Sequence, residues 1–396
     1  MKNKLSDRIN NLPVSATLAM AAKARELKNN GIDIIGLSLG EPDFNTPDFI
    51  KNAAIQAVND NYNSYTPVDG YSELKQSICN KFKRDNGLNY QPSQIVVSNG
   101  AKQSIANVVQ VLVNPGDDVL LVAPYWVSYS AIVTLAEGNP IEIRSDISSD
   151  FKITPLQLEN AITKRTKLVV INSPNNPSGS IYTEKEYLAL AKVLEKYPEI
   201  YILSDEIYEH INYGIPHFSF AKITSMYNRT ITVNGVAKAF AMTGWRIGYL
   251  GAPNWIAKAC TKMQGQITSG ANCIAQRATI AALDAPVSEI QYMIDEFKER
   301  RGLIIELLGG IEGIQLNQPK GAFYIFPDIS SFFGKTLKGK KINNASEFAI
   351  YLLEEAHVAT VTGDAFGSPN NIRISYAASK EEIKKAIARI SKALAD

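Results

Sequence analysis

Residues 231–251 of the chain read ITVNGVAKAFAMTGWRIGYLG, and this stretch places one lysine and one arginine among apolar and small residues. The flanking runs ITV and RIGYLG contain β-branched and aromatic residues, which predicts two buried strands. The small residues between them would let a ligand approach the backbone closely. Burial should lower the pKa of the Lys238 amine and allow it to attack a carbonyl carbon, while Arg246 could hold a phosphate. The alternative is a lysine at a strand end that reaches solvent.

The composition is that of an ordinary globular protein. The chain has 396 residues, of which 45% are apolar and 20% are charged, and this length favours two domains over one. A net charge of +2 gives no electrostatic reason to expect a nucleic acid or an anionic membrane as a partner. Residues 1–15 lack the apolar core of a signal peptide, and no apolar run is long enough for a membrane span. We therefore expect a cytoplasmic protein.

Cysteine and histidine are scarce. The three cysteines, at positions 79, 260 and 273, have neither the number nor the spacing of a disulfide framework or a metal site, and they fit a reducing compartment. None of the three histidines is paired with a cysteine, so no metal ion is expected. A catalytic triad based on histidine is also poorly supported.

Short β-branched runs alternate with helical windows between residues 93 and 234. The runs are QIVVSN, DVLLVAP, PIEIRS, KLVVINS, IYILSDE and RTITVN. Because they are apolar on both faces, they belong in a mostly parallel sheet covered by helices, where ligands bind beyond the carboxyl ends of the strands. Unusual residues fall at those ends, in SNGAK, APYW, NSPNNPSG, SDEIY and NGVAK. The sequence therefore predicts an α/β fold with one ligand crevice.

The two ends of the chain differ from this pattern. A helix capped by Ser15, a strand through IDIIGLSL and a helix begun at Thr46 and Pro47 precede the sheet. Beyond residue 309, the strands AFYIFPD, HVATVT and NIRISYA with two helices predict an α+β unit. We predict an N-terminal arm with part of a small domain over 1–45, a large domain over 46–290 and a small C-terminal domain over 291–396.

The motif SNGAKQS could form an anion site. It follows a strand and opens a helix, so the backbone N–H groups of Gly100, Ala101 and Lys102 could face an anion at the helix N-terminus. Many strand-to-helix turns contain glycine without binding anything. The sequence has no GxGxxG and no GxxxxGK[ST] motif, which disfavours a dinucleotide or a nucleoside triphosphate.

Further polar and aromatic residues stand near the strand ends. Asp205 ends an apolar strand, where a carboxylate needs a cation or strong donors unless it only caps a helix, and Tyr208 lies one turn on. Asn176 lies in a proline-flanked turn that could present an amide to a phenolate oxygen. Trp126 could stack on a ring or belong to the core. Arg373 stands alone in an apolar strand and should pair with a carboxylate of the protein or of a substrate.

Together these groups match one cofactor, pyridoxal 5′-phosphate, which needs a lysine amine, a carboxylate for its ring nitrogen, donors for its ring hydroxyl and an anion site. Over nearly its whole length the sequence resembles the fold-type I, class I aminotransferases, and most closely the bacterial aspartate aminotransferases of the thermophile and rhizobial subgroup. The matching motifs are SLGEPDF, YTPVDGYSELK, SNGAKQS, APYWVSY, NSPNNPSG, SDEIYEH, VNGVAKAFAMTGWRIGY and NIRISYA. The resemblance implies a large domain with a mostly parallel sheet and a smaller α+β domain.

The resemblance also implies roles. Lys238 resembles the lysine that forms a Schiff base and then moves the substrate proton, with Asp205 and Tyr208 as further catalytic residues at the ring nitrogen and ring hydroxyl. The other positions expected to bind the cofactor are Gly100, Ala101, Lys102, Trp126, Asn176, Arg246 and, across a homodimer interface, Tyr65. One departure is Gly235, which stands where many relatives carry a serine that bonds the phosphate.

Amino acids and 2-oxo acids are the implied substrates. Arg373 resembles the arginine that binds the α-carboxylate, with Gly40, Trp126 and Asn176 in the same pocket, and Lys102 resembles a lysine that contacts a distal carboxylate. The expected activity is therefore transfer of an amino group from aspartate to 2-oxoglutarate. The alternatives are related aminotransferases for aromatic amino acids, prephenate or alanine, a ligand-sensing domain of a transcription regulator, and a protein of this fold that has lost activity.

Overall fold

A computed structural model gives the fold of residues 5–12 and 14–395. Residues 1–4, 13 and 396 lie outside the described residues. The first five of these belong to the predicted N-terminal arm and to residues 1–15, where no signal peptide is expected.

The central element is a seven-stranded sheet, which confirms the predicted mostly parallel α/β fold. Its strands are β2 (Ile95–Ser98), β3 (Asp118–Ala123), β4 (Asn139–Arg144), β5 (Thr166–Asn172), β6 (Tyr201–Asp205), β7 (Thr230–Gly235) and β8 (Gly248–Gly251). Their order across the sheet is β2-β8-β7-β6-β5-β3-β4. Only β8 within this sheet runs antiparallel to its neighbours, so the carboxyl ends of β3, β5, β6 and β7 meet at one edge.

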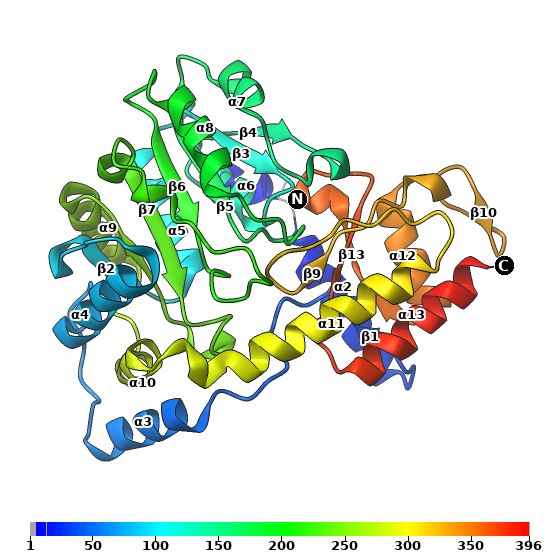
Figure 1. Ribbon diagram of the computed structural model, residues 1–396, viewed down its shortest axis with the longest axis horizontal. Coiled ribbons are helices and arrows are strands. Elements are labelled where there is room, and N and C mark those ends of the chain that lie inside the picture. The colour runs from blue at the N-terminus through cyan, green and yellow to red at the C-terminus, as the bar shows by residue number, and fades with distance from the viewer. Residues whose placement is uncertain (1–4, 13, 396) are drawn as a thin grey trace.

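Helices cover both faces of the sheet (Figure 1), and the side chains of both faces are apolar. Val119 and Leu121 of β3 face one side, and Leu120 and Val122 face the other, as the period of a strand requires. The first face packs against α5 (Ala101–Leu112), α6 (Ser128–Leu135) and α9 (Asn254–Ile267), and the second against α7 (Pro155–Ala161) and α8 (Glu184–Leu194). The β2 edge packs against α3 (Asp48–Asn59), α4 (Ser72–Lys81) and α10 (Cys273–Asp284).

A smaller group of elements lies beside the sheet (Figure 1) and packs around an apolar core of its own. Its strands form an antiparallel sheet, a parallel pair and a hairpin, namely β13-β14-β9, β1-β12 and β10-β11. Their bounds are β1 (Ile35–Gly36), β9 (Tyr324–Ile325), β10 (Thr336–Leu337), β11 (Lys340–Lys341), β12 (Val358–Ala359), β13 (Val361–Thr362) and β14 (Ile372–Ser375). The helices are α2 (Ala16–Asn29), α11 (Gln291–Gly309), α12 (Ala345–Glu355) and α13 (Lys380–Leu394).

The long helix α11 joins the two cores. Its first turns contribute Met293 and Ile294 to the core near β2, and its later turns contribute Ile304 and Leu308 to the smaller core. The predicted domain boundaries at 45/46 and 290/291 stay a prediction.

Three local predictions need correction. The strand expected through IDIIGLSL is only two residues long, and HVATVT divides into β12 and β13 because each half pairs with a different strand. Thr46 does not cap α3: Pro47 occupies the N-cap position, and the Thr46 hydroxyl donates instead to the carbonyl of Ala241 at 2.7 Å. Pairing and hydrogen bonds between distant segments decide these details.

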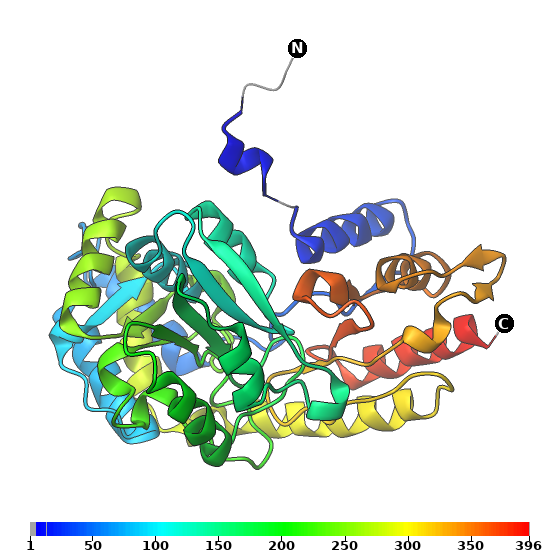
Figure 2. The ribbon, with the colours of Figure 1, turned by 90° about the horizontal axis from the view of Figure 1, so that it is seen from above.

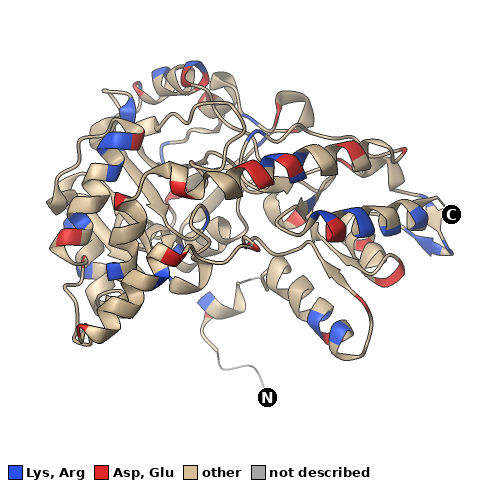
Figure 3. Ribbon diagram, turned by 60° about the horizontal axis from the view of Figure 1, so that its bottom comes forward, with Lys and Arg blue, Asp and Glu red and all other residues tan. Residues whose placement is uncertain are grey.

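The N-terminal segment with α1 (Asp7–Asn10) rises from the body of the molecule (Figure 2). It exposes apolar side chains, since Leu5, Ile9 and Val14 are 57%, 50% and 83% exposed. Charged residues of both signs are interspersed over the helices in the view of Figure 3. Within residues 5–12 and 14–395, no helix combines the length and the apolar character needed to cross a membrane.

Gly248 supplies a stability test of how β8 meets α5. A Cβ atom at this position would lie 2.1 Å from the backbone nitrogen of Ala101, so backbone would have to move. We expect Gly248→Ala to lower the free energy of unfolding by about 2 kcal/mol or more, measured as a shift of the urea midpoint.

The control is Gly302→Ala in α11, where a Cβ atom would meet nothing within 4 Å. There the replacement should stabilise the helix by about 0.5–1 kcal/mol. Equal midpoints for the two variants would contradict the close approach of β8 to α5.

Candidate functional site

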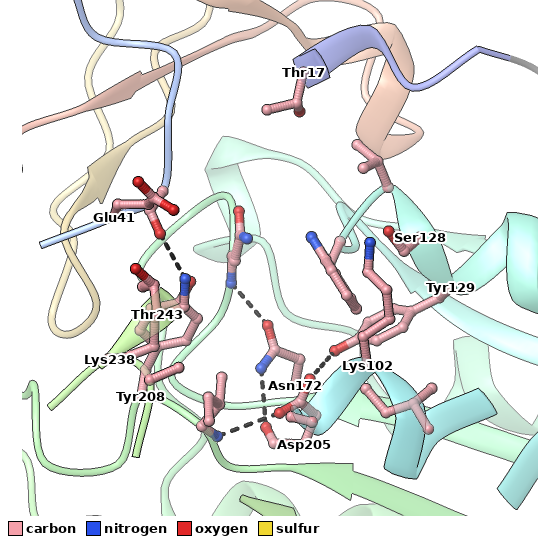
Figure 4. A pocket seen from close by; sticks show the side chains of 18 of the residues that line it. Thr17, Glu41, Lys102, Ser128, Tyr129, Asn172, Asp205, Tyr208, Lys238 and Thr243 are labelled. Atoms are coloured by element: carbon pink, nitrogen blue, oxygen red, sulfur yellow. Dashed lines mark hydrogen bonds between the residues drawn. The ribbon is translucent and has the colours of Figure 1, made fainter. Parts of the chain in front are cut away.

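One cavity of about 350 Å³ lies at the carboxyl ends of β3, β5, β6 and β7 (Figure 4). Ten of the twelve predicted site residues line it, and the two others are Gly100 and Tyr65. The ten are Gly40, Ala101, Lys102, Trp126, Asn176, Asp205, Tyr208, Lys238, Arg246 and Arg373. The crevice predicted from the strand ends is therefore present.

Lys238 reaches into this cavity from the segment that follows β7 (Figure 4). Its amine donates a hydrogen bond to the carbonyl of Gly40 at 2.5 Å and lies 5.6 Å from the centre of the Tyr208 ring. Burial, and next the positive charge of Arg373, lower the pKa of the amine to about 8. A sizeable fraction of this lysine is therefore neutral near physiological pH.

Asp205 ends β6 on the floor of the cavity and is 4% exposed. Its Oδ2 accepts a hydrogen bond from the Tyr129 hydroxyl at 2.6 Å, and its Oδ1 accepts one from the Ile207 backbone N–H at 3.3 Å. Burial raises the pKa of Asp205 to about 6, although these two donors pull in the opposite direction. A ligand that brought a positive charge to this carboxylate would offset its desolvation.

Arg373 lies on β14 and is 2% exposed, so its charge is buried. Its Nη1 donates to Asn176 Oδ1 at 2.9 Å, and its Nη2 donates to the Ser38 carbonyl at 2.6 Å. Its Nε has no hydrogen-bond partner among the described residues. The guanidinium also lies between the rings of Tyr324 and Phe366, at 4.6 and 5.0 Å from their centres. Such a group favours binding of a carboxylate.

The opposite part of the cavity is an anion cradle at the start of α5. Gly100 is the N-cap residue with φ +86°, and a Cβ atom there would lie 2.3 Å from Arg246 Nη2, so the guanidinium rests on glycine backbone. Arg246 donates to the carbonyls of Thr243 and Asn99 at 2.9 and 3.4 Å. Gly100 therefore shapes the cradle without lining the cavity.

Lys102 extends from the first turn of α5 over the ring of Trp126, with its amine 4.9 Å from the ring centre. Loss of solvation and the nearby charge of Arg246 lower the pKa of Lys102. Among the residues that the structure describes, no carboxylate lies within ion-pair distance of the cavity-lining cations Lys102, Lys238, Arg246 and Arg373. The cavity is therefore suited to anionic ligands.

Several lining residues were missed by the sequence-based reasoning. Tyr324 of β9 places its hydroxyl 2.8 Å from the Tyr208 hydroxyl, yet in the sequence it looks like a core aromatic in AFYIFPD. Thr17 of α2 lines the cavity with a buried hydroxyl that has no partner in the described part of the chain. Tyr129 could have been found, because it lies one helical turn after Trp126 in APYWVSY.

Tyr65 is the predicted residue that the structure does not bring to the cavity of its own chain. Its side chain is 100% exposed in the turn-rich stretch before α4. Its expected place in the cavity of a second subunit stays a prediction.

The pKa of Asp205 generates a test on the cofactor-free protein. Its folded-state pKa of about 6 exceeds the unfolded value of 3.8, so the stability gained from the bound proton is complete below pH 3.8 and is lost as the pH rises through 6. Asp205→Asn removes this titration and should make the protein more stable at pH 8 by about 2–3 kcal/mol, an order of magnitude set by the size of the shift. The gain should shrink toward pH 4. Urea unfolding at both pH values measures it.

Tyr129→Phe serves as the opposite control, because it removes the 2.6 Å hydrogen bond that stabilises the charged form. This variant should be less stable than the wild type at pH 8. An Asp205→Asn protein with the same pH dependence as the wild type would contradict a raised pKa.

Comparison with known proteins shows the family of the chain. The family model described as aminotransferase class I and II matches residues 32–390. The aspartate/prephenate aminotransferase of Cereibacter sphaeroides is 46% identical, with 98% of this chain and 97% of that protein covered. The aspartate aminotransferase structure from Rhizobium meliloti has a TM-score of 0.96 at 43% identity, with 99% of each chain covered. The structure of the Thermus thermophilus aspartate aminotransferase with maleate has a TM-score of 0.93 at 39% identity, with 99% of this chain and 100% of that chain covered. The chain therefore belongs to the class I and II aminotransferases and is a pyridoxal-phosphate-dependent enzyme.

Proposed function

We propose that this aminotransferase transfers the amino group of L-aspartate to 2-oxoglutarate, giving oxaloacetate and L-glutamate. The observation that supports this choice is a pair of cations, Arg373 and Lys102, that line the same cavity as Lys238 from different elements. Both substrates are dicarboxylates, so one cation would bind the α-carboxylate and the other the distal carboxylate. The related Thermus enzyme was solved with maleate, which is also a dicarboxylate.

The cavity residues fit pyridoxal 5′-phosphate at both of its ends. The first-turn N–H groups of α5 and the Arg246 guanidinium on Gly100 form a cradle for the phosphate, and a side chain at Gly100 would fill it. At the other end, the buried Asp205 carboxylate needs a positive charge, which a protonated ring nitrogen supplies. A Cβ atom added at Gly235 would lie 2.9 Å from the Ile247 carbonyl oxygen. Because Gly235 has no side chain to donate to the phosphate, the donors of this cradle would be backbone N–H groups and Arg246.

The ring of the cofactor would be held by the residues between these ends. Trp126 offers its face, Tyr208 its hydroxyl and Asn176 its amide. Because Asn176 Oδ1 accepts from Arg373, the NH₂ side of this amide remains to donate to a ligand. Asn176 would thus connect the residue that binds the substrate carboxylate to the residue set that binds the cofactor.

The remaining chemistry belongs to the side chains of this chain. When bound, the cofactor supplies an electron sink for the α-carbon of the substrate. Lys238, with a pKa of about 8, is partly neutral near physiological pH and would take the α-proton as a general base. Asp205 would keep the proton on the ring nitrogen, and Arg373 would orient the α-carboxylate so that the α-proton faces Lys238.

We also infer a homodimer with shared active sites. Tyr65 is fully exposed, and the protruding N-terminal segment exposes Leu5, Ile9 and Val14. Isolated apolar side chains on a protruding arm are stabilised when a second subunit covers them. A cytoplasmic location is proposed as well, since Cys79, Cys260 and Cys273 are free thiols.

A second candidate activity is amino transfer to prephenate. The relative from Cereibacter sphaeroides is named for both aspartate and prephenate, and the apolar side chains of Leu18 and Leu39 line the cavity beside the cations. Aromatic amino acids and alanine stay as further alternatives. A panel of 2-oxo acids with glutamate or aspartate as the donor separates these activities.

Lys238→Ala tests the chemistry. Addition of L-aspartate to the wild type with bound pyridoxal phosphate should remove the long-wavelength absorbance band of the cofactor. Addition of 2-oxoglutarate should restore this band. The variant should bind the cofactor without this response and lose turnover by a factor of about 10³ or more, because its general base is gone.

Lys262→Ala on α9 is the control for the loss of a lysine, and it should behave as the wild type. Conversion of the spectrum by aspartate in Lys238→Ala would contradict the role given to this residue. A wild type that responds to another amino acid and not to aspartate would overturn the substrate.

Lys102→Met tests the choice of a dicarboxylate. Methionine keeps an apolar side chain over Trp126 and removes the charge. We expect the KM for aspartate to rise about 10- to 100-fold, since a charge-assisted hydrogen bond is lost, while the KM for phenylalanine changes little. Steady-state kinetics with both donors measures this, and an equal change in the two KM values would remove the assignment.

A further inference from the structure

A buried polar network lies behind the segment that holds Asp205 and Tyr208, and the chemistry above does not use it. Its central group is Glu209, which is 4% exposed, and its other members are Lys81, Asn86 and Asn234, which are 1%, 6% and 2% exposed. We call these four residues the Glu209 network.

Glu209 accepts hydrogen bonds from three residues that belong to two other parts of the chain. Oε1 accepts from the Lys81 amine and from Asn234 Nδ2, the latter at 2.7 Å, and Oε2 accepts from Asn86 Nδ2 at 2.6 Å. The Lys81 amine also donates to Asn86 Oδ1 at 2.7 Å. Both oxygens of a buried carboxylate are thus used.

The elements joined in this way lead to the cavity. Glu209 stands one residue after Tyr208 and four after Asp205, and Asn234 stands four residues before Lys238. Lys81 ends α4, and Asn86 ends the π-helical turn Phe82–Asn86 that follows it. Such turns are rare and are often associated with functional sites. One carboxylate therefore connects the strand ends that hold Asp205, Tyr208 and Lys238.

The Lys81–Glu209 pair lies among other charged groups, since Asp85 Oδ2 is 3.9 Å from the Lys81 amine and His210 Nε2 is 3.4 Å from Glu209 Oε1. Burial would raise the pKa of Glu209, but Lys81, followed by His210 and His217, outweighs burial and holds this pKa well below its ordinary range. The neighbouring Glu206 pairs with His217 Nε2 at 2.9 Å. Glu206, Glu209 and His217 are close enough together to hold a metal ion, but the ammonium of Lys81 already occupies Glu209. The contacts favour two hydrogen-bonded ion pairs, Lys81–Glu209 and His217–Glu206, over a metal site.

A buried ion pair of this kind is a poor source of net stability. The free-energy cost of removing two charges from water often exceeds the free energy gained from their attraction. Replacing the whole pair by apolar side chains is therefore frequently neutral or stabilising. The pair instead provides geometric specificity, because each hydrogen bond fixes the position of one segment of the chain relative to another. Its value is therefore greatest where several segments must face one ligand.

We propose that Lys81 and Glu209 are positioning residues of the aminotransferase site: through Asn86 and Asn234 they hold the segments after β6 and β7 so that Asp205, Tyr208 and Lys238 face one cofactor. This inference rests on the proposed cofactor chemistry and not on the choice of aspartate. It assigns to residues outside the cavity a share of cofactor affinity and of turnover.

The test compares Glu209→Gln and Lys81→Met with a matched control, Arg229→Met. Arg229 is also a largely buried cation, 9% exposed, and it donates to the carbonyls of Tyr197, Ile200 and Leu194. It precedes the amino end of β7, at the opposite edge of the sheet from the cavity. The measurements are the Tm and the Kd for pyridoxal phosphate of the cofactor-free protein, and then kcat and KM.

We expect Glu209→Gln and Lys81→Met to raise the Kd for pyridoxal phosphate and to lower kcat, each about 10- to 100-fold, because small misplacements of reacting groups have effects of this size. The KM for aspartate should stay within about twofold, since Arg373 is held by β14 and Asn176. Arg229→Met should lower the Tm but leave Kd and kcat within about twofold of the wild type. Variants of the network that lose only Tm, as this control does, would overturn the proposal.

Asn234→Ala covers the case in which the charge variants do not fold. It removes one neutral donor from Glu209 and leaves the Lys81–Glu209 pair intact. A raised Kd with a Tm close to the wild-type value would support the proposal, and an unchanged Kd would overturn it. A wild type that binds pyridoxal phosphate but does not use aspartate would overturn only the substrate, because the Kd comparison still holds. A wild type that binds no pyridoxal phosphate would overturn both.

Discussion

The site depends on the burial of the Asp205 carboxylate at the end of β6. A carboxylate that is 4% exposed is unfavourable in its charged form, and its pKa of about 6 shows that two hydrogen bonds do not fully compensate. Burial acts on the Lys238 amine in the opposite direction and lowers its pKa to about 8. In the cavity alone, both groups are therefore shifted toward their neutral forms. A ligand with a cationic ring nitrogen and an anionic phosphate reverses this condition, since it gives Asp205 a positive partner and Arg246 a negative one.

The parallel sheet makes this arrangement possible because it brings strand ends together without bringing their sequences together. Asp205 ends β6, Asn176 follows β5 and Lys238 follows β7, while Arg373 lies on β14 of the smaller sheet. Close approach of backbone is the second requirement. Glycine at positions 100 and 248 lets Arg246 and β8 pack directly against the start of α5, where any side chain would collide.

The sequence predicted the strands of the large sheet and most of the site because these features are local. Short continuous runs of β-branched and other apolar residues indicated β3 and β5, and Asp205 and Arg373 stood out as charged residues in apolar strands. The misses are contacts between distant segments. Thr46 looked like a helix cap, but its hydroxyl bonds Ala241, 195 positions away. Tyr324 looked like core, but its hydroxyl meets Tyr208 across 116 positions. No local pattern contains such pairings.

The Glu209 network belongs to the same class of feature. In the sequence, Lys81 is an ordinary lysine near the end of an amphipathic helix, and Glu209 follows a motif tyrosine without any mark of its own. Only the fold shows that both are buried against each other. An exposed ion pair contributes little to stability, whereas removal of either partner of a buried pair leaves an uncompensated buried charge. The Lys81–Glu209 pair lies directly behind Asp205 and Tyr208, where the orientation of side chains matters most. The mechanism of this enzyme thus depends on contacts that lie outside its cavity.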